Sequence, residues 1–226
     1  MTDNKQKMAW DPEWENIHIK EELGKYPSEN LIRFIAANYY KVKNRKEIKI
    51  LEFGCGKGPQ IWYLAREGFD VYGIDGSKTA ITLAKKRLSE ENLDANLIVG
   101  DIISTKFPND YFDCVVDIEC LVCNDWNSTV EIIKEIIRIL KPEGSFFSQT
   151  FSDKTSIGEK FTKVEENTYK EIIGSSLGRK RLLRLLPEKD LYKLYSGFSK
   201  IFYDKLFYTY QNMKYESEEL LISCYK

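Results

Sequence analysis

The chain has 226 residues, with 34 lysines and arginines against 35 aspartates and glutamates and a formal net charge of -1. This balance argues against a nucleic-acid-binding protein, which usually has a basic surface. No apolar run is long enough to cross a membrane, and the polar start of the chain lacks a signal-peptide core, so we expect no membrane partner and a cytoplasmic location. The hydrophobic fraction of 42% is enough for a core and no Pro/Gly/Ser-rich linker interrupts it, which predicts a single domain over residues 1–226.

Residues 1–45 precede the first strand and are expected to form an arm and a helix. Ser28 is the expected N-cap of a helix with apolar residues from Leu31 to Tyr39. The indoles of Trp10 and Trp14 could serve only to anchor the arm to the domain. His18 is the only histidine, and it is a candidate catalytic residue because imidazole is the side chain that titrates near neutral pH.

The segment 48–66 predicts a strand, a glycine loop and a helix. The short apolar run that ends at Phe53 leads into glycines at 54, 56 and 58, and Pro59 stands where a helix would begin. This arrangement is typical of a nucleotide-like ligand at the end of a parallel strand. A dinucleotide fingerprint would need glycine at position 59, and no Gly-Lys-Ser/Thr ends the loop, so the NAD and P-loop interpretations are weakened.

Three further short strands each end near an acid. The strand 70–75 ends at Asp75, which could accept hydrogen bonds from ribose hydroxyls or could cap the next helix, where Ser77 is an equally good N-cap. The strand 95–100 is followed by Asp101 and Ile102, and the alternative for Asp101 is a turn. The strand 111–120 contains Asp117 and Glu119.

The second half of the chain predicts a longer series of elements. Residues 128–140 have apolar side chains at helical spacing, residues 141–144 predict a turn, and a fifth strand begins at 145. Within residues 151–199, the segment 178–186 predicts a helix with a basic face that is either solvated or attracts an anionic substrate. Within residues 200–226, the segments Leu206 to Tyr210 and Glu219 to Tyr225 predict two strands joined by a turn.

The cysteines do not predict a metal site. Cys120 and Cys123 have CxxC spacing, but a zinc site needs about four ligands and the other three cysteines are scattered. Strand-end cysteines are usually buried apolar fillers, and a disulfide is disfavoured in the expected compartment.

The glycine loop, written as acidic-x-Gly-x-Gly-x-Gly from Glu52, resembles motif I of the class I S-adenosylmethionine-dependent methyltransferases. The acids that end the next strands and the turn Leu140-Lys141-Pro142-Glu143-Gly144 resemble later motifs of the same family, in order, over about Lys49 to Thr150. The resemblance implies a Rossmann-like α/β fold with a doubly wound seven-stranded sheet, mostly parallel with a C-terminal antiparallel hairpin. It implies an N-terminal lid, a cofactor-binding core over 46–150, a substrate-side insertion over 151–199 and a hairpin over 200–226 that closes the sheet. It also implies that S-adenosylmethionine is held by Glu52, Gly54, Cys55, Gly56, Gly58, Asp75, Gly76, Ser77, Asp101, Ile102, Asp117 and Glu119.

The activity implied by this resemblance is methyl transfer to an oxygen or nitrogen of a small-molecule acceptor by in-line displacement. The amino-methylation signature Asn/Asp-Pro-Pro-Tyr/Phe is absent after the fourth strand, which disfavours a DNA adenine or protein glutamine target. If the acceptor must lose a proton, His18 and Glu119 are the candidate bases. Two alternatives stay open, an NAD(P)-binding oxidoreductase and a catalytically silent subunit that binds S-adenosylmethionine.

Overall fold

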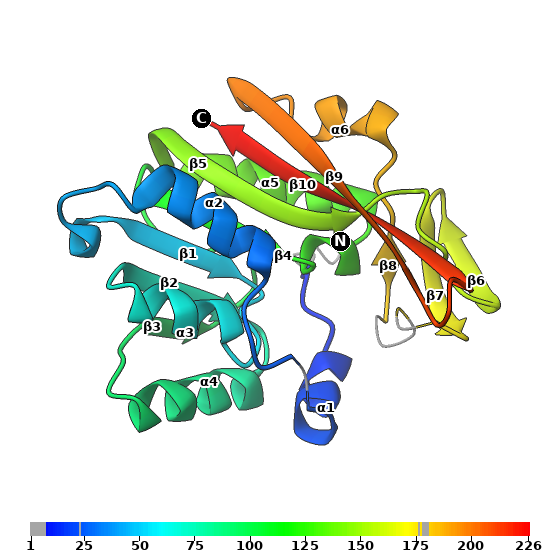
Figure 1. Cartoon of the computed structure of the whole chain (residues 1–226), viewed down its shortest axis with the longest axis horizontal. Coiled ribbons are helices and arrows are strands. Elements are labelled where there is room, and N and C mark those ends of the chain that lie inside the picture. Colours follow the sequence, from blue (N-terminus) through cyan, green and yellow to red (C-terminus); the bar gives the residue numbers. More distant parts are fainter. Residues whose placement is uncertain (1–7, 23, 176, 178–180) are drawn as a thin grey trace, which may run out of the picture.

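A twisted seven-stranded sheet forms the centre of the molecule (Figure 1). The computed structural model describes residues 8–22, 24–175, 177 and 181–226. The strand order is β3-β2-β1-β4-β5-β10-β9; the first five strands are parallel to one another, and β10 is antiparallel to both β5 and β9. The predicted fold class is therefore confirmed. The strand bounds are β1 Lys49–Phe53, β2 Asp70–Asp75, β3 Asn96–Val99, β4 Phe112–Ile118, β5 Leu140–Phe151, β9 Lys200–Tyr210 and β10 Tyr215–Tyr225.

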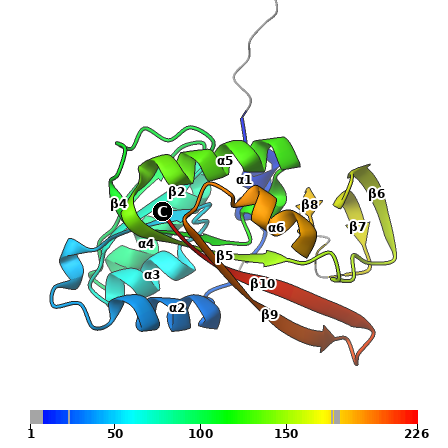
Figure 2. The ribbon, with the colours of Figure 1, turned by 90° about the horizontal axis from the view of Figure 1, so that it is seen from above.

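Helices cover both faces of this sheet, and a separate core lies under each layer (Figure 2). On one face lie α2 (Glu29–Tyr39), α3 (Pro59–Arg66) and α4 (Lys78–Glu90), which bury a stripe that includes Leu31, Leu64 and Ala84. On the other face lie α5 (Trp126–Ile139) and α6 (Glu188–Leu194), which bury Ile136 and Leu191. The central strands are apolar on both sides because each side meets a helix layer.

The connectivity places a crevice at one edge of the sheet. The chain runs outward from β1 through β2 to β3 and then returns to β4 on the other side of β1. Adjacent crossovers therefore leave the sheet in opposite directions between β1 and β4. In open α/β sheets, ligands bind outside the carboxyl ends of the strands at such a switch point.

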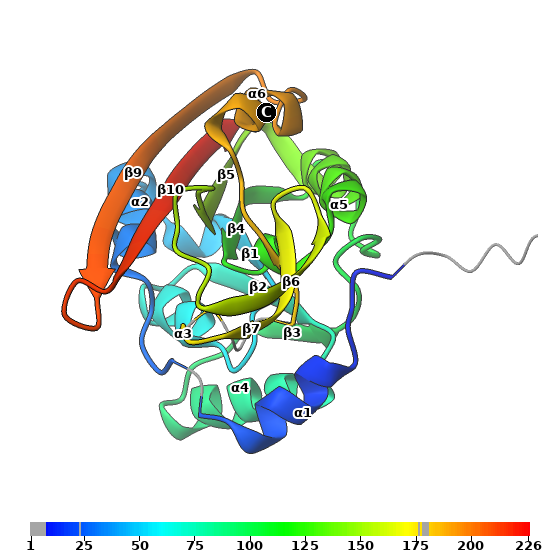
Figure 3. The same cartoon turned by 90° about the vertical axis from the view of Figure 1, so that its right-hand side faces the viewer.

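The segment after β5 forms a second, smaller sheet beside the C-terminal hairpin (Figure 3). Its order is β6-β7-β8, with β6 at Lys160–Glu165, β7 at Thr168–Ile173 and β8 at Leu183–Arg184. The helix with a basic face predicted over 178–186 is wrong for its described part, because residues 181–186 form a bend and an extended strand. Its residues Arg179 and Lys180 lie outside the described residues.

The physical reason for this correction is burial on both sides of β8. Leu183 and Leu185 pack into the core of the small sheet, whereas Leu186 packs into the core under α5. A strand between two cores has apolar residues at both odd and even positions. Hydrophobic periodicity cannot distinguish such a run from a short helix. Arg184 is only 2% exposed and lies over the ring of Trp126 at 5.8 Å, so it does not belong to a solvated face.

The remaining elements differ from the predictions in detail. A short helix, α1 (Glu13–Lys20), precedes α2, and 3-10 turns occur at Arg45–Glu47 (η1) and Leu121–Cys123 (η2). Helix α5 begins two residues before the predicted position because the Asp125 side chain caps it by accepting the N–H of Ser128 at 2.8 Å. The predicted turn over 141–144 lies within β5, as an irregular start with φ +63° at Glu143. Within the described residues, no helix combines the length and apolarity needed to span a membrane.

Candidate active site

A cleft of about 940 Å³ opens along the carboxyl ends of β1, β2, β3 and β4. The glycine loop after β1 forms its floor. Gly54 has φ +62° and a Cβ there would lie 2.2 Å from Sγ of Cys120, so only glycine allows the loop after β4 to approach so closely. Gly56 has φ +51° and its N–H points toward β2.

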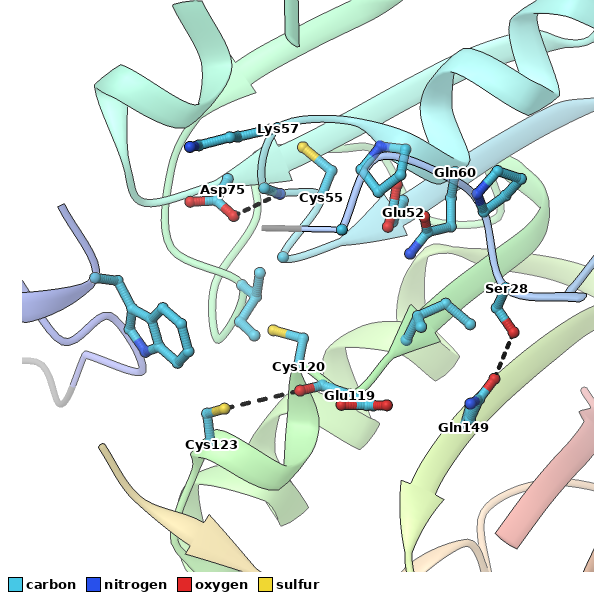
Figure 4. Close-up of a pocket in the computed structure, with 18 of the residues that line it drawn as sticks. Ser28, Glu52, Cys55, Lys57, Gln60, Asp75, Glu119, Cys120, Cys123 and Gln149 are labelled. Atoms are coloured by element: carbon cyan, nitrogen blue, oxygen red, sulfur yellow. Dashed lines mark hydrogen bonds between the residues drawn. The ribbon is translucent and has the colours of Figure 1, made fainter. Parts of the chain in front are cut away.

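Asp75, at the end of β2, ties that strand to the glycine loop (Figure 4). Its carboxylate accepts the N–H of Gly56 through Oδ2 and the N–H of Ser77 through Oδ1, both at 2.8 Å. The hydroxyl of Ser77 caps α4 by accepting the N–H of Ala80 at 2.9 Å, so Asp75 is not the helix cap. Burial raises the pKa of Asp75. Asp75 also lines the cleft, where the lone pairs that its two backbone partners leave unused can accept hydrogen bonds from a ligand.

Asp101 and Ile102, just after β3, form the end wall of the same cleft. Oδ1 of Asp101 accepts the N–H of Ile103 at 2.9 Å, which makes a local turn of the kind considered as the alternative. Oδ2 accepts the backbone N–H of Trp10 at 3.0 Å, so the carboxylate also holds the N-terminal arm. The turn and a role toward a ligand are compatible, because each carboxylate oxygen can accept two hydrogen bonds.

Around the glycine loop, three polar side chains of the cleft have a buried atom without a hydrogen-bond partner among the described residues. These atoms are Oε2 of Glu52, Oε1 of Gln60 and Nδ1 of His18. Buried polar atoms are almost always paired in folded proteins, so three orphans around one space indicate a polar ligand that pairs with them. Burial, and then the charges of Asp75 and Asp117, raise the pKa of Glu52 well above its usual value. A cationic donor would reverse that shift.

The structure does not bring every predicted site residue into the cleft lining. Gly58 instead lets α3 approach α4, since a Cβ there would lie 3.0 Å from Cβ of Ala84. Ser77 serves as the cap described above. Asp117 is fully buried and holds the loop after β4, accepting the N–H of Cys120 at 2.9 Å and the hydroxyl of Ser148 at 2.6 Å. The cleft is lined by the other predicted residues: Glu52, Gly54, Cys55, Gly56, Asp75, Gly76, Asp101, Ile102, Glu119 and His18.

Helix α1 roofs the glycine loop. Glu15 fixes it to the start of α4 by accepting the N–H of Thr79 at 3.1 Å and its hydroxyl at 2.5 Å. His18 faces the loop: its Cε1 would lie 3.5 Å from a Cβ at Gly56. Burial lowers the pKa of His18, and the negative charge of Asp75 opposes this shift only in part. His18 is therefore neutral at pH 7 and stands on the glycine-loop side of the cleft.

The far half of the cleft is built by residues that the sequence did not point to. Ser28 is the N-cap residue of α2, as predicted, but its side chain makes no capping hydrogen bond. Its hydroxyl donates instead to Oε1 of Gln149 at 2.6 Å (Figure 4). Gln149 in turn donates to Glu219 at 2.5 Å, which also accepts the hydroxyl of Tyr208 at 2.8 Å. Tyr210 lines the same region and its hydroxyl is buried without a partner. Aromatic side chains are dense in the last part of the sequence, but their density alone does not distinguish a cleft wall from a core.

The loop after β4 connects the two halves. Glu119 has φ +58°, which is uncommon for a residue with a Cβ, and its N–H is held by the carbonyl of Gln149 at 3.0 Å. Cys120 and Cys123 also line the cleft and are only partly buried, so they are not the buried fillers that we expected of strand-end cysteines. The reason is the turn η2, which directs this loop along the cleft. Among the described residues, no three His, Cys, Asp or Glu are grouped to hold a metal ion.

Comparison with known proteins agrees with this geometry. A family model described as a methyltransferase domain matches residues 50–144. A malonyl-[acyl-carrier protein] O-methyltransferase of Priestia megaterium is 31% identical, over 59% of this chain and 46% of that protein. The uncharacterized methyltransferase YodH of Bacillus subtilis is 26% identical, over 83% of this chain and 87% of that protein. A solved S-adenosylmethionine-dependent methyltransferase from Methanosarcina mazei has a TM-score of 0.63 at 23% identity, over 89% of this chain and 98% of that one.

The sheet order and the cleft define a Rossmann-like α/β protein with a ligand site at its switch point. Residues 50–144 match a methyltransferase domain, and this match together with the relatives supports a class I S-adenosylmethionine-dependent methyltransferase with S-adenosylmethionine as its cofactor. It spans about half the length of several of the curated relatives that it matches. The residues present fit this cofactor, because the orphaned atoms of Glu52, Gln60 and His18 surround the glycine loop.

Proposed function

We propose that this protein transfers a methyl group from S-adenosylmethionine to an oxygen or nitrogen of a small-molecule acceptor. The observation that carries the proposal is one continuous cleft, which joins the acidic strand ends and the glycine loop to a far half lined by Tyr208 and Tyr210. Its volume of about 940 Å³ suits a cofactor together with a small acceptor, since ligand pockets usually measure about 300–1,000 Å³.

The cofactor half of the cleft supplies one partner for each polar part of the cofactor. Asp75 accepts hydrogen bonds from the ribose hydroxyls with the lone pairs left free by Gly56 and Ser77. Asp101 accepts from the adenine amino group, and Ile102 packs on the ring. Glu52 pairs with the ammonium group through its orphaned Oε2, which offsets the cost of burying that carboxylate.

When bound, S-adenosylmethionine supplies a methyl group that its sulfonium charge already activates. The protein therefore has to position the acceptor in line and exclude water, which is where most of the rate enhancement of such a displacement arises. Ser28, Gln149 and Glu219 form a hydrogen-bonded chain behind the acceptor half that orients its polar groups. Burial and the neighbouring Glu219 raise the pKa of Tyr208 to about 12, so its phenol stays protonated.

Of the two candidate bases, Glu119 is the better placed for an acceptor that must lose a proton. It lies on the loop after β4, held by the carbonyl of Gln149 at the acceptor half. His18 lies over Gly56, on the cofactor side. With its neutral imidazole we assign it to the ribose or the methionine part of the cofactor, where its orphaned Nδ1 can accept a hydrogen bond.

The proposal is tested by titration calorimetry with S-adenosylhomocysteine, followed by a screen of cofactor consumption over small alcohols, phenols, carboxylic acids and amines. We expect binding of S-adenosylhomocysteine and turnover with at least one oxygen or nitrogen acceptor. Glu119→Gln should lower kcat at neutral pH with little change in cofactor affinity. Binding without turnover on any acceptor would identify a silent binding subunit, and absence of binding at millimolar ligand would refute the proposal.

A further inference from the structure

The residue after Asp75 is a glycine that its own backbone conformation does not require. Gly76 does not take a positive φ, so an L side chain could adopt its conformation. The obstacle is the N-terminal arm: a Cβ at Gly76 would lie 2.1 Å from both Cδ2 and Cε3 of Trp10. The indole of Trp10 therefore packs on Gly76 and fills the space that a side chain at position 76 would occupy.

The structure holds Trp10 in this position from several sides. The backbone N–H of Trp10 donates to Oδ2 of Asp101, just after β3, at 3.0 Å. The preceding residue, Ala9, packs against the core cluster that includes Ile102. Helix α1, which follows, is fixed to α4 by the hydrogen bonds from Thr79 to Glu15. Trp10 thus bridges the residues that follow β2 and β3, at the end of the cleft assigned above to adenine.

The indole lines this space and does not fill it. Trp10 is part of the wall of a cleft that still measures about 940 Å³ with the arm in place. If the indole were a plug, the cleft would close at this end. Both Gly76 and Asp101 also line the cleft beside Trp10, so their surfaces stay accessible to a ligand.

We propose that Trp10 is a wall of the adenine subsite, where its indole supplies the apolar surface that Gly76 lacks. The inference rests on the proposed cofactor. Asp101 accepts the backbone N–H of Trp10 and also faces adenine, so docking of the arm and binding of the cofactor stabilise each other. The arm is then a cofactor-binding element.

The test compares dissociation constants of S-adenosylhomocysteine and of adenosine for wild type, Trp10→Ala and Met8→Ala. We expect Trp10→Ala to weaken both ligands by the same factor, about tenfold, the order found for stacking of a base on an aromatic ring. Met8→Ala is the matched arm control and should bind as wild type does, because Met8 is 61% exposed and does not line the cleft. An equal loss for adenosine places the effect at the nucleoside end.

A second pair of variants separates a wall from a general anchor of the arm. Gly76→Leu alone should weaken binding, because its side chain and the indole compete for one space. In the Trp10→Ala background the same Gly76→Leu change should restore part of the affinity. Adenosine should also quench indole fluorescence in wild type and in Trp62→Phe, and Trp10→Phe should lose this quenching.

The outcomes are distinct. Unchanged affinity of Trp10→Ala would overturn the inference while the proposed function stands, and tighter binding would show that the indole obstructs the site. A double variant as weak as Trp10→Ala, with quenching retained in Trp10→Phe, would reduce Trp10 to an anchor and also overturn it. If the wild-type protein binds neither ligand, the proposed function fails first and this inference falls with it.

Discussion

Replacing Asp75 by alanine tests the centre of the cofactor site. The carboxylate holds two backbone N–H groups at 2.8 Å and, in our proposal, two ribose hydroxyls. A hydrogen bond to a charged group contributes about 1.5–3 kcal/mol, so loss of the two ribose bonds removes about 3–6 kcal/mol of binding free energy. Since each 1.4 kcal/mol is about tenfold in affinity, we expect at least a hundredfold weaker binding of S-adenosylhomocysteine.

The effect of Asp75→Ala on folding is expected to be much smaller. The variant strands the N–H groups of Gly56 and Ser77, but it also removes a carboxylate whose burial raises its pKa, and these two changes oppose each other. We expect a loss of about 2 kcal/mol or less in the free energy of unfolding, measured by urea denaturation without ligand.

Asp70→Ala provides a matched control from the opposite end of β2. Its carboxylate accepts the hydroxyl of Tyr72 at 3.3 Å and does not line the cleft, so cofactor affinity should not change. A folded Asp75→Ala protein that binds S-adenosylhomocysteine as tightly as wild type would refute the ribose assignment.

Three further predictions concern the floor, the buried acid and the roof of the cleft. Gly56→Val should abolish calorimetric binding, because a β-branched residue resists φ +51° and projects into the cofactor space, and normal binding would show that the loop does not approach the ligand. The raised pKa of Glu52 makes the ligand-free fold lose stability as pH rises above about 4.5. Glu52→Gln should therefore flatten this decline in the free energy of unfolding, measured by urea titrations at several pH values, and should weaken cofactor binding about tenfold or more. An unchanged pH profile of stability would contradict this reasoning. Deleting residues 1–20 should lower the rate of methyl transfer while leaving the melting temperature of the core little changed. Full activity of the truncated protein would refute the assignment of α1 as the roof of the cleft.

The sequence alone determined the cofactor half of this protein. The glycines at 54 and 56 and the acids at 75 and 101 are local signals: each stands directly after an apolar strand, where chain direction and turn geometry decide its position. Parallel strands bring their carboxyl ends to one edge, so once β1 to β4 are identified, Asp75 and Asp101 have to lie on the same cleft. Hydrophobic periodicity likewise identified α5.

Only the tertiary structure decided which residues form the rest of the cleft. Ser28 and Gln149, which are 121 residues apart, meet there with Tyr208 of the hairpin strand β9, and no local pattern encodes that contact. The same holds for Trp10 on Gly76, where a glycine is explained by an indole from the arm and not by its own backbone. Asp117 shows the converse: its sequence position matches a ligand-facing motif, yet burial and the N–H groups of its own loop use its carboxylate for structure. Strand ends are set by short-range geometry, whereas walls and roofs are set by packing between distant segments, and for that reason the acceptor half could not be predicted.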